Sequence, residues 1–212
     1  MGYCGELIRS IEELKRSHVR RIVEKRISEF KELGRKENRE IFKELCFCIL
    51  CANYSAERAI KIQKRIDDGF ITLSREELAE KLKEAGHRFP SSRAKYIVSA
   101  RKYCDSIKEI IESFNDPNQL RRWLVRNILG IGLKEASHFL RNVGFKNVAI
   151  IDRHILKVMV KHGLIEKTPK TLTRKKYLEL EEKLKEVAEE TGLSLAELDL
   201  YLWYMETGRI LK

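Results

Sequence analysis

Residues 126–157 read RNILGIGLKEASHFLRNVGFKNVAIIDRHILK, and this stretch decides the fold. A Gly-Ile-Gly turn, Gly130 to Gly132, lies between two apolar segments and is followed by Lys134. Glycines permit positive φ and leave no side chain between the turn and a ligand. A helix that begins near Leu133 would direct its free N–H groups and its positive dipole end outward, which suits a phosphate. The stretch therefore predicts two helices joined by an anion-binding hairpin, although an ordinary helix–helix turn can carry the same glycines.

The rest of the chain also favours helices. Apolar residues recur at helical spacing over residues 6–33, with a bend expected near Ser17 and His18. We expect one long helix over residues 91–114 and a charged helix over residues 169–191. No segment alternates between apolar and polar residues with the period of a strand. The predicted fold class is all-α.

The charge balance favours a polyanionic partner. The 212 residues include 43 Lys and Arg against 32 Asp and Glu, which gives a formal net charge of +11. Cations that displace counterions from a phosphate backbone gain affinity for nucleic acid. The alternative is a solvated surface rich in Lys, Glu and Ile, as in a thermophile.

The five cysteines indicate a reducing compartment. They are odd in number and mostly clustered: Cys4, Cys46, Cys48, Cys51 and Cys104. The cluster lies in the apolar run IFKELCFCILCA, where cysteine serves as a small apolar residue of a buried helix. The alternative is a metal or redox site at the CxxC. Because no apolar run is long enough to span a bilayer and no signal-peptide pattern opens the chain, we expect a cytoplasmic, nucleoid-associated protein with no membrane partner.

Two blocks of the quoted stretch resemble a known superfamily. ILGIGLKEASHFL resembles the L-P-G-hydrophobic-G-x-K-x-A pattern of the helix-hairpin-helix (HhH-GPD) DNA glycosylases, with Leu129 where many members have proline. IIDRHI resembles the block that carries their essential aspartate, here Asp152, followed by His154. The resemblance implies a two-lobed helical fold with an active-site cleft between the lobes. It implies one catalytic unit, residues 1–212, made of a central lobe that ends in the hairpin (54–135) and a second lobe (1–53 plus 136–212).

The resemblance also implies roles in catalysis. Lys134 would attack C1′ of the deoxyribose as a neutral amine, the base would leave, and a Schiff base would permit β-elimination on the 3′ side. Asp152 would stabilise the oxocarbenium charge and help to deprotonate Lys134. His154 would position the adjacent phosphate, and Gly130 and Gly132 would contact the DNA backbone. The alternative for Lys134 is a solvated surface lysine.

Two further segments resemble the archaeal-type (type 2) 8-oxoguanine DNA glycosylases, namely GHRFPSSRAKYI and the C-terminal LDLYLWYMETGRILK. The resemblance implies that Trp203 and Phe89 stack on an extruded base. It implies that Lys212 distinguishes 8-oxoguanine from guanine, and that Asn53 enters the gap left in the duplex. The alternative for Trp203 is packing within an amphipathic helix.

The discrimination requires an acceptor near N7–H, which 8-oxoguanine has and guanine lacks. The terminal carboxylate of Lys212 is a candidate for this acceptor. Its ammonium is a candidate partner of Asp152 or of the base.

The expected function is therefore a bifunctional glycosylase and abasic-site lyase that removes 8-oxoguanine from duplex DNA and acts as a monomer. One alternative is a glycosylase for another damaged or mismatched base, and another is a non-catalytic helix-hairpin-helix DNA-binding module. Since no cysteine follows Cys104, the four-cysteine iron–sulfur cluster of endonuclease III-like members is not expected. The resemblance also implies a structural Na⁺ or K⁺ in the hairpin, on main-chain carbonyls near Arg126, Ile128 and Ile131, and no other cofactor.

Overall fold

The computed structural model describes residues 3–212, with side chains described from Gly5 onward, and every regular element in that range is helical. In chain order the elements are α1 (Tyr3–Lys15), α2 (Val19–Leu33), α3 (Asn38–Cys51), α4 (Ala56–Ile66), α5 (Gly69–Thr72), α6 (Arg75–Glu84), α7 (Pro90–Ala100), the 3-10 turn η1 (Arg101–Tyr103), α8 (Ile107–Glu112), α9 (Pro117–Asn127), α10 (Leu133–Asn142), α11 (Arg153–Lys161), α12 (Arg174–Glu190) and α13 (Leu195–Thr207). The predicted all-α class is confirmed. None of these helices combines the length and the apolar character that crossing a bilayer requires.

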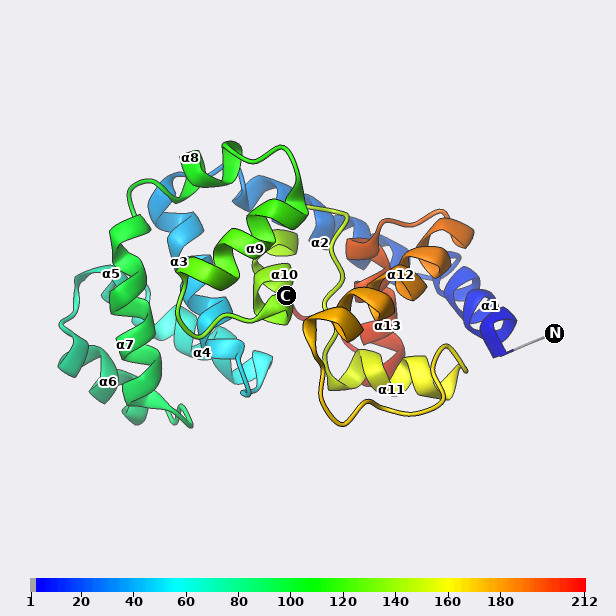
Figure 1. The fold of residues 1–212 in the computed structure, drawn as a ribbon. Coiled ribbons are helices and arrows are strands. Elements are labelled where there is room, and N and C mark those ends of the chain that lie inside the picture. Colours follow the sequence, from blue (N-terminus) through cyan, green and yellow to red (C-terminus); the bar gives the residue numbers. More distant parts are fainter. Residues whose placement is uncertain (1–2) are drawn as a thin grey trace.

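The helices form two groups that lie side by side (Figure 1). The first group is α3 to α10 and the second is α1 with α11 to α13, while α2 contacts both α10 and α13. The largest cluster of buried apolar side chains runs from Ile41 to Val148, and a second joins Leu7 and Ile11 to residues 149–202. The predicted lobe boundaries, after residues 53 and 135, stay a prediction. The first cluster continues across both of these positions.

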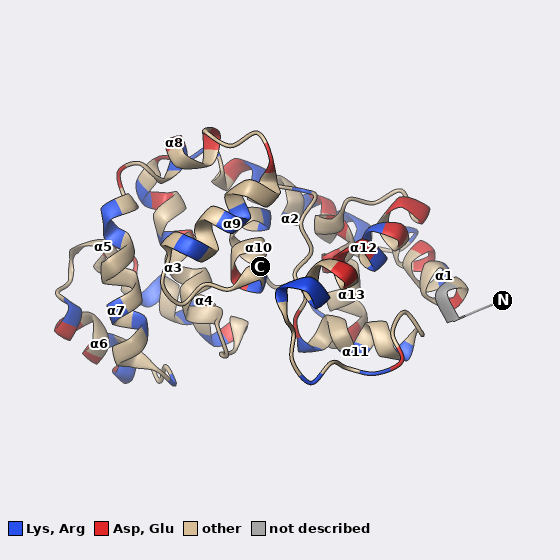
Figure 2. Ribbon diagram, in the orientation of Figure 1, with Lys and Arg blue, Asp and Glu red and all other residues tan. Residues whose placement is uncertain are grey.

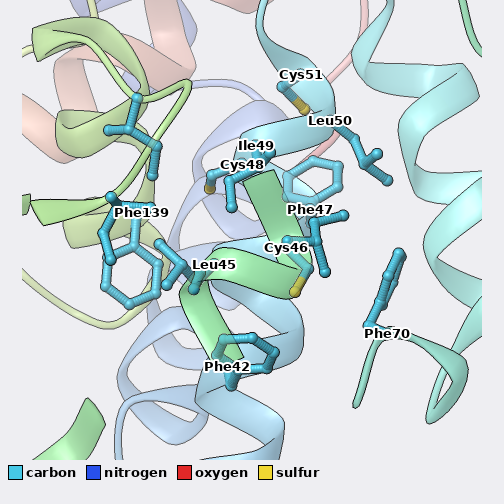
Figure 3. Packing of buried hydrophobic residues seen from close by; sticks show 14 of the residues in the cluster. Phe42, Leu45, Cys46, Phe47, Cys48, Ile49, Leu50, Cys51, Phe70 and Phe139 are labelled. Carbon is cyan, nitrogen blue, oxygen red and sulfur yellow. The ribbon is translucent and has the colours of Figure 1, made fainter. Parts of the chain in front are cut away.

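Helix α3 lies at the centre of the first group. All its residues from Ile41 to Cys51 are buried, so beyond its first turn no face of this helix is left to solvent. Figure 3 shows Phe139 and Phe70 on opposite sides of its side chains. The thiols of Cys46, Cys48, Cys51 and Cys104 are free and buried, and burial raises the pKa of Cys51 to about 12. Cys48 and Cys51 of the CxxC belong to the largest cluster of buried apolar side chains. Within the described residues no group of three or more His, Cys, Asp or Glu side chains is arranged to hold a metal.

The prediction of one helix over residues 91–114 is wrong. Helix α7 ends at Ala100, and the chain passes through η1 before α8 begins at Ile107. The reason is a contact with a distant residue. The side chain of Asn38 accepts a hydrogen bond from Lys108 N (2.7 Å) and donates one to the Asp105 carbonyl (2.9 Å). These bonds satisfy backbone groups that a continuous helix would have paired internally.

Side-chain caps determine the ends of several other helices. The expected bend near Ser17 is confirmed, because its hydroxyl donates to Leu14 O and accepts from Val19 N between α1 and α2. The prediction that a helix begins at Pro169 is wrong. Helix α12 begins at Arg174, where the Thr173 hydroxyl caps it by accepting from Lys176 N.

Candidate active site

The hairpin between α9 and α10 brings backbone and an aromatic ring into close contact. Gly130 has φ of +79°, and a Cβ at this position would lie 2.3 Å from Cδ2 of Tyr96. Gly132 precedes the first turn of α10, and the Leu129 side chain is 47% exposed. The turn therefore requires glycine at position 130 both for its backbone conformation and for the space beside Tyr96.

Lys134 lies in the first turn of α10, and its side chain is 26% exposed. Its Nζ is 3.0 Å from Oε1 of Glu135, and the other oxygen of Glu135 accepts a hydrogen bond from Gly132 N (3.1 Å). One carboxylate thus connects the hairpin to the lysine. The sequence analysis missed Glu135, although an acid three residues after the residue that precedes a helix is a recognisable capping signal.

Asp152 lies where an extended segment ends and α11 begins. Its Oδ1 accepts hydrogen bonds from His154 N (2.8 Å) and Ile155 N (3.0 Å), so it caps the helix. Behind it, Asp199 of α13 pairs with Arg141 of α10. The pKa of Asp199 is raised to about 6, chiefly by burial and in part by the negative charge of Asp152, while Arg141 acts in the opposite direction. Asp152 is therefore close to a second carboxylate, and it is itself half-buried.

Helix α12 holds the segment that leads into Asp152. The Tyr177 hydroxyl donates to the Ala149 carbonyl (2.7 Å) and accepts from Ile151 N (3.2 Å). Glu181 accepts from Ala149 N (2.8 Å) and forms a buried two-pronged pair with Arg121 of α9 (2.6 and 2.7 Å). Because these groups bind the backbone on either side of residue 150, they orient the residue that caps α11.

His154 and Trp203 are in contact, one from α11 and one from α13. Their ring centroids are 4.8 Å apart in an edge-on arrangement, and His154 Nδ1 lies 3.6 Å from Oε1 of Glu206. Both the Nδ1 of His154 and the Nε1 of Trp203 are buried without a hydrogen-bond partner. Two polar atoms without partners on adjacent rings are typical of a binding site rather than of a packed core.

Phe89 and Asn53 lie on two loops that are bonded to each other. Asn53 is exposed with φ of +55°, and the hydroxyl of its neighbour Tyr54 donates to Gly86 O in the other loop (2.9 Å). His87 is buried, and it bonds the Leu50 carbonyl through Nε2 (3.1 Å) and accepts from Phe89 N through Nδ1 (3.0 Å). Burial lowers the pKa of His87, which agrees with a neutral ring that donates at one nitrogen and accepts at the other.

Arg93 of α7 ties this loop region to the hairpin. Its guanidinium donates to the Ala52 carbonyl and lies 5.5 Å from the ring centre of Phe89 and 5.7 Å from that of Tyr96. Tyr96 is the ring that packs against Gly130. The residues Asn53, Phe89 and Gly130 are therefore brought together through Arg93, which the sequence analysis did not single out.

An open groove begins beside Asn53. It has a volume of about 430 Å³, and Tyr54, Arg58, Lys61 and Arg65 line it together with Gly86. Figure 2 shows Lys and Arg on many helices, including α9 and the first turn of α12. The basic side chains of the groove are exposed and suit contacts with an extended polyanion.

The C-terminal residue leaves the second group of helices and binds the first. Lys212 Nζ is 2.5 Å from Oε2 of Glu44 and donates to Oε1 of Gln63 (2.6 Å). The hypothesis that this ammonium pairs with Asp152 is wrong in this structure, because Glu44 and Gln63 occupy it. An acid inside an apolar run was the available signal for Glu44.

The predicted residues thus fall into two sets. Hairpin, lysine and loop residues belong to the first group of helices, and Asp152, His154 and Trp203 belong to the second. Within residues 3–212 no hydrogen bond or ion pair joins Lys134 to Asp152; each has its own partner. The buried Arg141–Asp199 and Arg121–Glu181 pairs connect the two groups next to these residues.

The structure is similar first to a wider class of fold and then to a particular family. A structure of an Endonuclease III–DNA complex matches 88% of this chain and 83% of its own with a TM-score of 0.55 at 18% identity, which shows the helix-hairpin-helix fold. The model of the family described as 8-oxoguanine DNA glycosylase matches residues 23–193. The chain belongs to this 8-oxoguanine DNA glycosylase family.

Relatives agree over nearly the whole chain. The 8-oxoguanine DNA glycosylase/AP lyase of Methanocaldococcus jannaschii is 59% identical over 97% of this chain and 99% of its own. The Korarchaeum cryptofilum protein of the same name is 53% identical over 98% of each chain. The M. jannaschii enzyme solved with a 15mer DNA containing 8-oxoguanine matches with a TM-score of 0.95 at 58% identity, covering 98% of this chain and all of the other.

Proposed function

We propose that this protein removes 8-oxoguanine from duplex DNA and then cleaves the strand at the resulting abasic site, acting as a monomer. The observation that carries the proposal is a lysine in the first turn of α10, directly after a glycine hairpin, in a member of the 8-oxoguanine DNA glycosylase family. A DNA-binding module needs the glycines but has no use for this lysine. The relatives named 8-oxoguanine DNA glycosylase/AP lyase support both activities.

Lys134 acts as the nucleophile. Its neutral amine attacks C1′ of the damaged nucleotide, the bond from C1′ to the base breaks, and the base leaves with the electron pair and then takes up a proton. Loss of the amine proton and opening of the sugar ring give a Schiff base on C1′. Removal of a C2′ proton then expels the 3′ phosphate in a β-elimination. The carboxylate of Glu135, 3.0 Å from Nζ, is placed to orient the amine of Lys134.

Asp152 stabilises the positive charge that develops on the sugar as the base departs. Its oxygen accepts two backbone N–H groups at the start of α11, so its position is fixed while its second oxygen stays available. The Arg141–Asp199 pair behind it and the Tyr177 hydroxyl before it restrict its movement. His154, next to the cap, positions the adjacent phosphate.

The extruded base lies between aromatic side chains. Trp203 and Phe89 stack on it, and Asn53 enters the space that it leaves in the duplex. A main-chain oxygen of Lys212 accepts a hydrogen bond from N7–H, which guanine does not have. In guanine the N7 lone pair would point at this oxygen, so two acceptors would be opposed and guanine would bind poorly.

A monovalent cation fits the hairpin. Among the described residues, no hydrogen bond is directed to the carbonyl oxygens of Arg126, Ile128 and Ile131, which are the groups that would hold Na⁺ or K⁺. When bound, the ion would rigidify the turn and add positive charge near a DNA phosphate. The side chains of the described residues offer no metal site of their own.

Borohydride trapping tests the proposal. The protein is incubated with a labelled duplex that carries 8-oxoguanine opposite cytosine, with and without borohydride. We expect a covalent complex that Lys134→Gln abolishes while duplex binding persists. Asp152→Asn should slow base release, yet shift the free energy of unfolding by less than ~1 kcal/mol because asparagine also caps helices. Binding without trapping or cleavage would favour a non-catalytic module, and trapping only on other lesions would favour a different base.

A further inference from the structure

The ammonium of Lys212 binds residues of the first group of helices, and its side chain is 22% exposed. Its ammonium is 2.5 Å from Oε2 of Glu44 and 2.6 Å from Oε1 of Gln63, and it lies 4.4 Å from the ring centre of Phe47. A carboxylate, an amide oxygen and an aromatic face are three groups that attract a cation. The lysine side chain is therefore a bound anchor.

Glu44 is an unusual residue in its surroundings. It is 2% exposed, and it belongs to the helix whose neighbouring residues are all buried and mostly apolar. Its Oε1 accepts from the side chain of Asn142 (2.6 Å), and its Oε2 accepts from Gln63 (3.3 Å) as well as pairing with Lys212. A buried carboxylate is costly unless a cation balances it. Lys212 is that cation, so the last residue of the chain and the central helix depend on each other.

The main chain of Lys212 is held too. His138 is one turn after Lys134 on α10, and burial lowers the pKa of His138. A hydrogen bond between its imidazole and the main chain of Lys212 has the opposite effect on this pKa. The cations Lys134 and Lys212 lower that pKa further, which places both of them close to His138. The terminal residue is thus fixed at both ends, within electrostatic reach of the proposed nucleophile.

We propose that Glu44 is a positioning residue for base recognition: by binding the ammonium of Lys212, it places the main chain of Lys212 at the base pocket. This inference rests on the proposed function, in which a main-chain oxygen of Lys212 accepts from N7–H of 8-oxoguanine. A main-chain oxygen has two lone pairs, so one bond to His138 leaves another acceptor position for the base. Glu44 itself does not touch the base.

The test separates reading of the base from cleavage of the sugar. Single-turnover release of 8-oxoguanine and cleavage of a preformed abasic site are measured for the wild-type protein, Glu44→Gln, Lys212→Met and the double variant. An abasic site has no base to recognise. Since a hydrogen bond to a charged group is involved, we expect Glu44→Gln to slow base release by about 10-fold or more while abasic cleavage changes by less than about 2-fold. In the Lys212→Met background, Glu44→Gln should add almost nothing.

A matched control lies one residue earlier on the same helix. Lys43 is mostly buried and pairs with Asp67 (2.8 Å) and Asp68 (2.7 Å), away from Lys212. Lys43→Met should lower the melting temperature without changing the ratio of base release to abasic cleavage. Gln63→Leu removes the second contact to the Lys212 ammonium and should slow base release in the same sense, which keeps the test decisive if Glu44→Gln does not fold.

The inference is overturned if Glu44→Gln releases 8-oxoguanine at the wild-type rate, or if it slows both reactions equally as a general loss of structure would. Additive effects of Glu44→Gln and Lys212→Met would also overturn it. By contrast, a wild-type protein that neither releases the base nor cleaves abasic DNA would refute the proposed function itself.

Discussion

Replacing Gly130 with alanine should destabilise the protein by about 2–5 kcal/mol, through two separate costs. The backbone has φ of +79° at this position, where an L-residue costs about 1–2 kcal/mol. The added Cβ would lie 2.3 Å from Cδ2 and 2.7 Å from Cε2 of Tyr96. The ring must therefore move, and overpacking of this kind costs about 1–3 kcal/mol.

A second glycine isolates the two costs. Gly192 has φ of +64°, but a Cβ there would meet nothing within 4 Å, so Gly192→Ala should cost only about 1–2 kcal/mol. Urea unfolding gives the loss in free energy of unfolding for each variant, and the difference between the two losses measures the contact with Tyr96. Adding Tyr96→Ala to Gly130→Ala should remove this difference. Gly130→Ala should also weaken duplex binding. Equal destabilisation by the two alanines would refute the close approach of Tyr96 to the hairpin.

Two further predictions concern pH and salt. Burial raises the pKa of Asp199 from 3.8 to about 6, so the folded protein binds more protons than the unfolded chain between these values. The stability of the wild type relative to Asp199→Asn should therefore fall as the pH rises from about 4 to about 6 and stay constant above; a difference that does not vary with pH in urea unfolding would contradict this. Lys61→Gln, in the basic groove, should reduce the slope of log affinity against log salt by about 0.9, as loss of one phosphate contact requires. Lys183→Gln on α12 should leave the slope unchanged, and identical slopes for both variants would exclude the groove from the DNA surface.

Local chemistry determines several of the helix boundaries. Asp152 caps α11 through bonds to backbone N–H groups two and three residues away, and Asp116 caps α9 with Pro117 in its first turn. Such capping residues lie within one turn of the helix boundary, so they can be recognised in the sequence. The break within residues 91–114 is different. Asn38 determines it from a distant part of the sequence, and no local pattern reports that contact.

The candidate site divides in the same way. Lys134 and the hairpin glycines belong to one short motif, so the sequence predicts them together. Glu44 and Arg93 act only through contacts between helices. In the sequence, each of them is only a charged residue among apolar or aromatic neighbours. Its role can be inferred once the structure shows which residue it contacts. For Glu44 that partner is the last residue of the chain, 2.5 Å away.

Three ion pairs join the two groups of helices: the buried pairs Arg121 with Glu181 and Arg141 with Asp199, and the pair of Lys212 with the buried Glu44. Apolar contacts of similar volume would often give as much stability, because taking two charges out of water offsets most of their attraction. An ion pair differs in requiring one geometry, since a displaced partner leaves an uncompensated buried charge. Lys134 comes from one group and Asp152 from the other, and no direct bond between them among the described residues fixes their separation. The three pairs supply that constraint: they join α9 to α12, α10 to α13, and α3 to Lys212. Lys134 lies on one of these helices, and Asp152 directly precedes α11 in the second group.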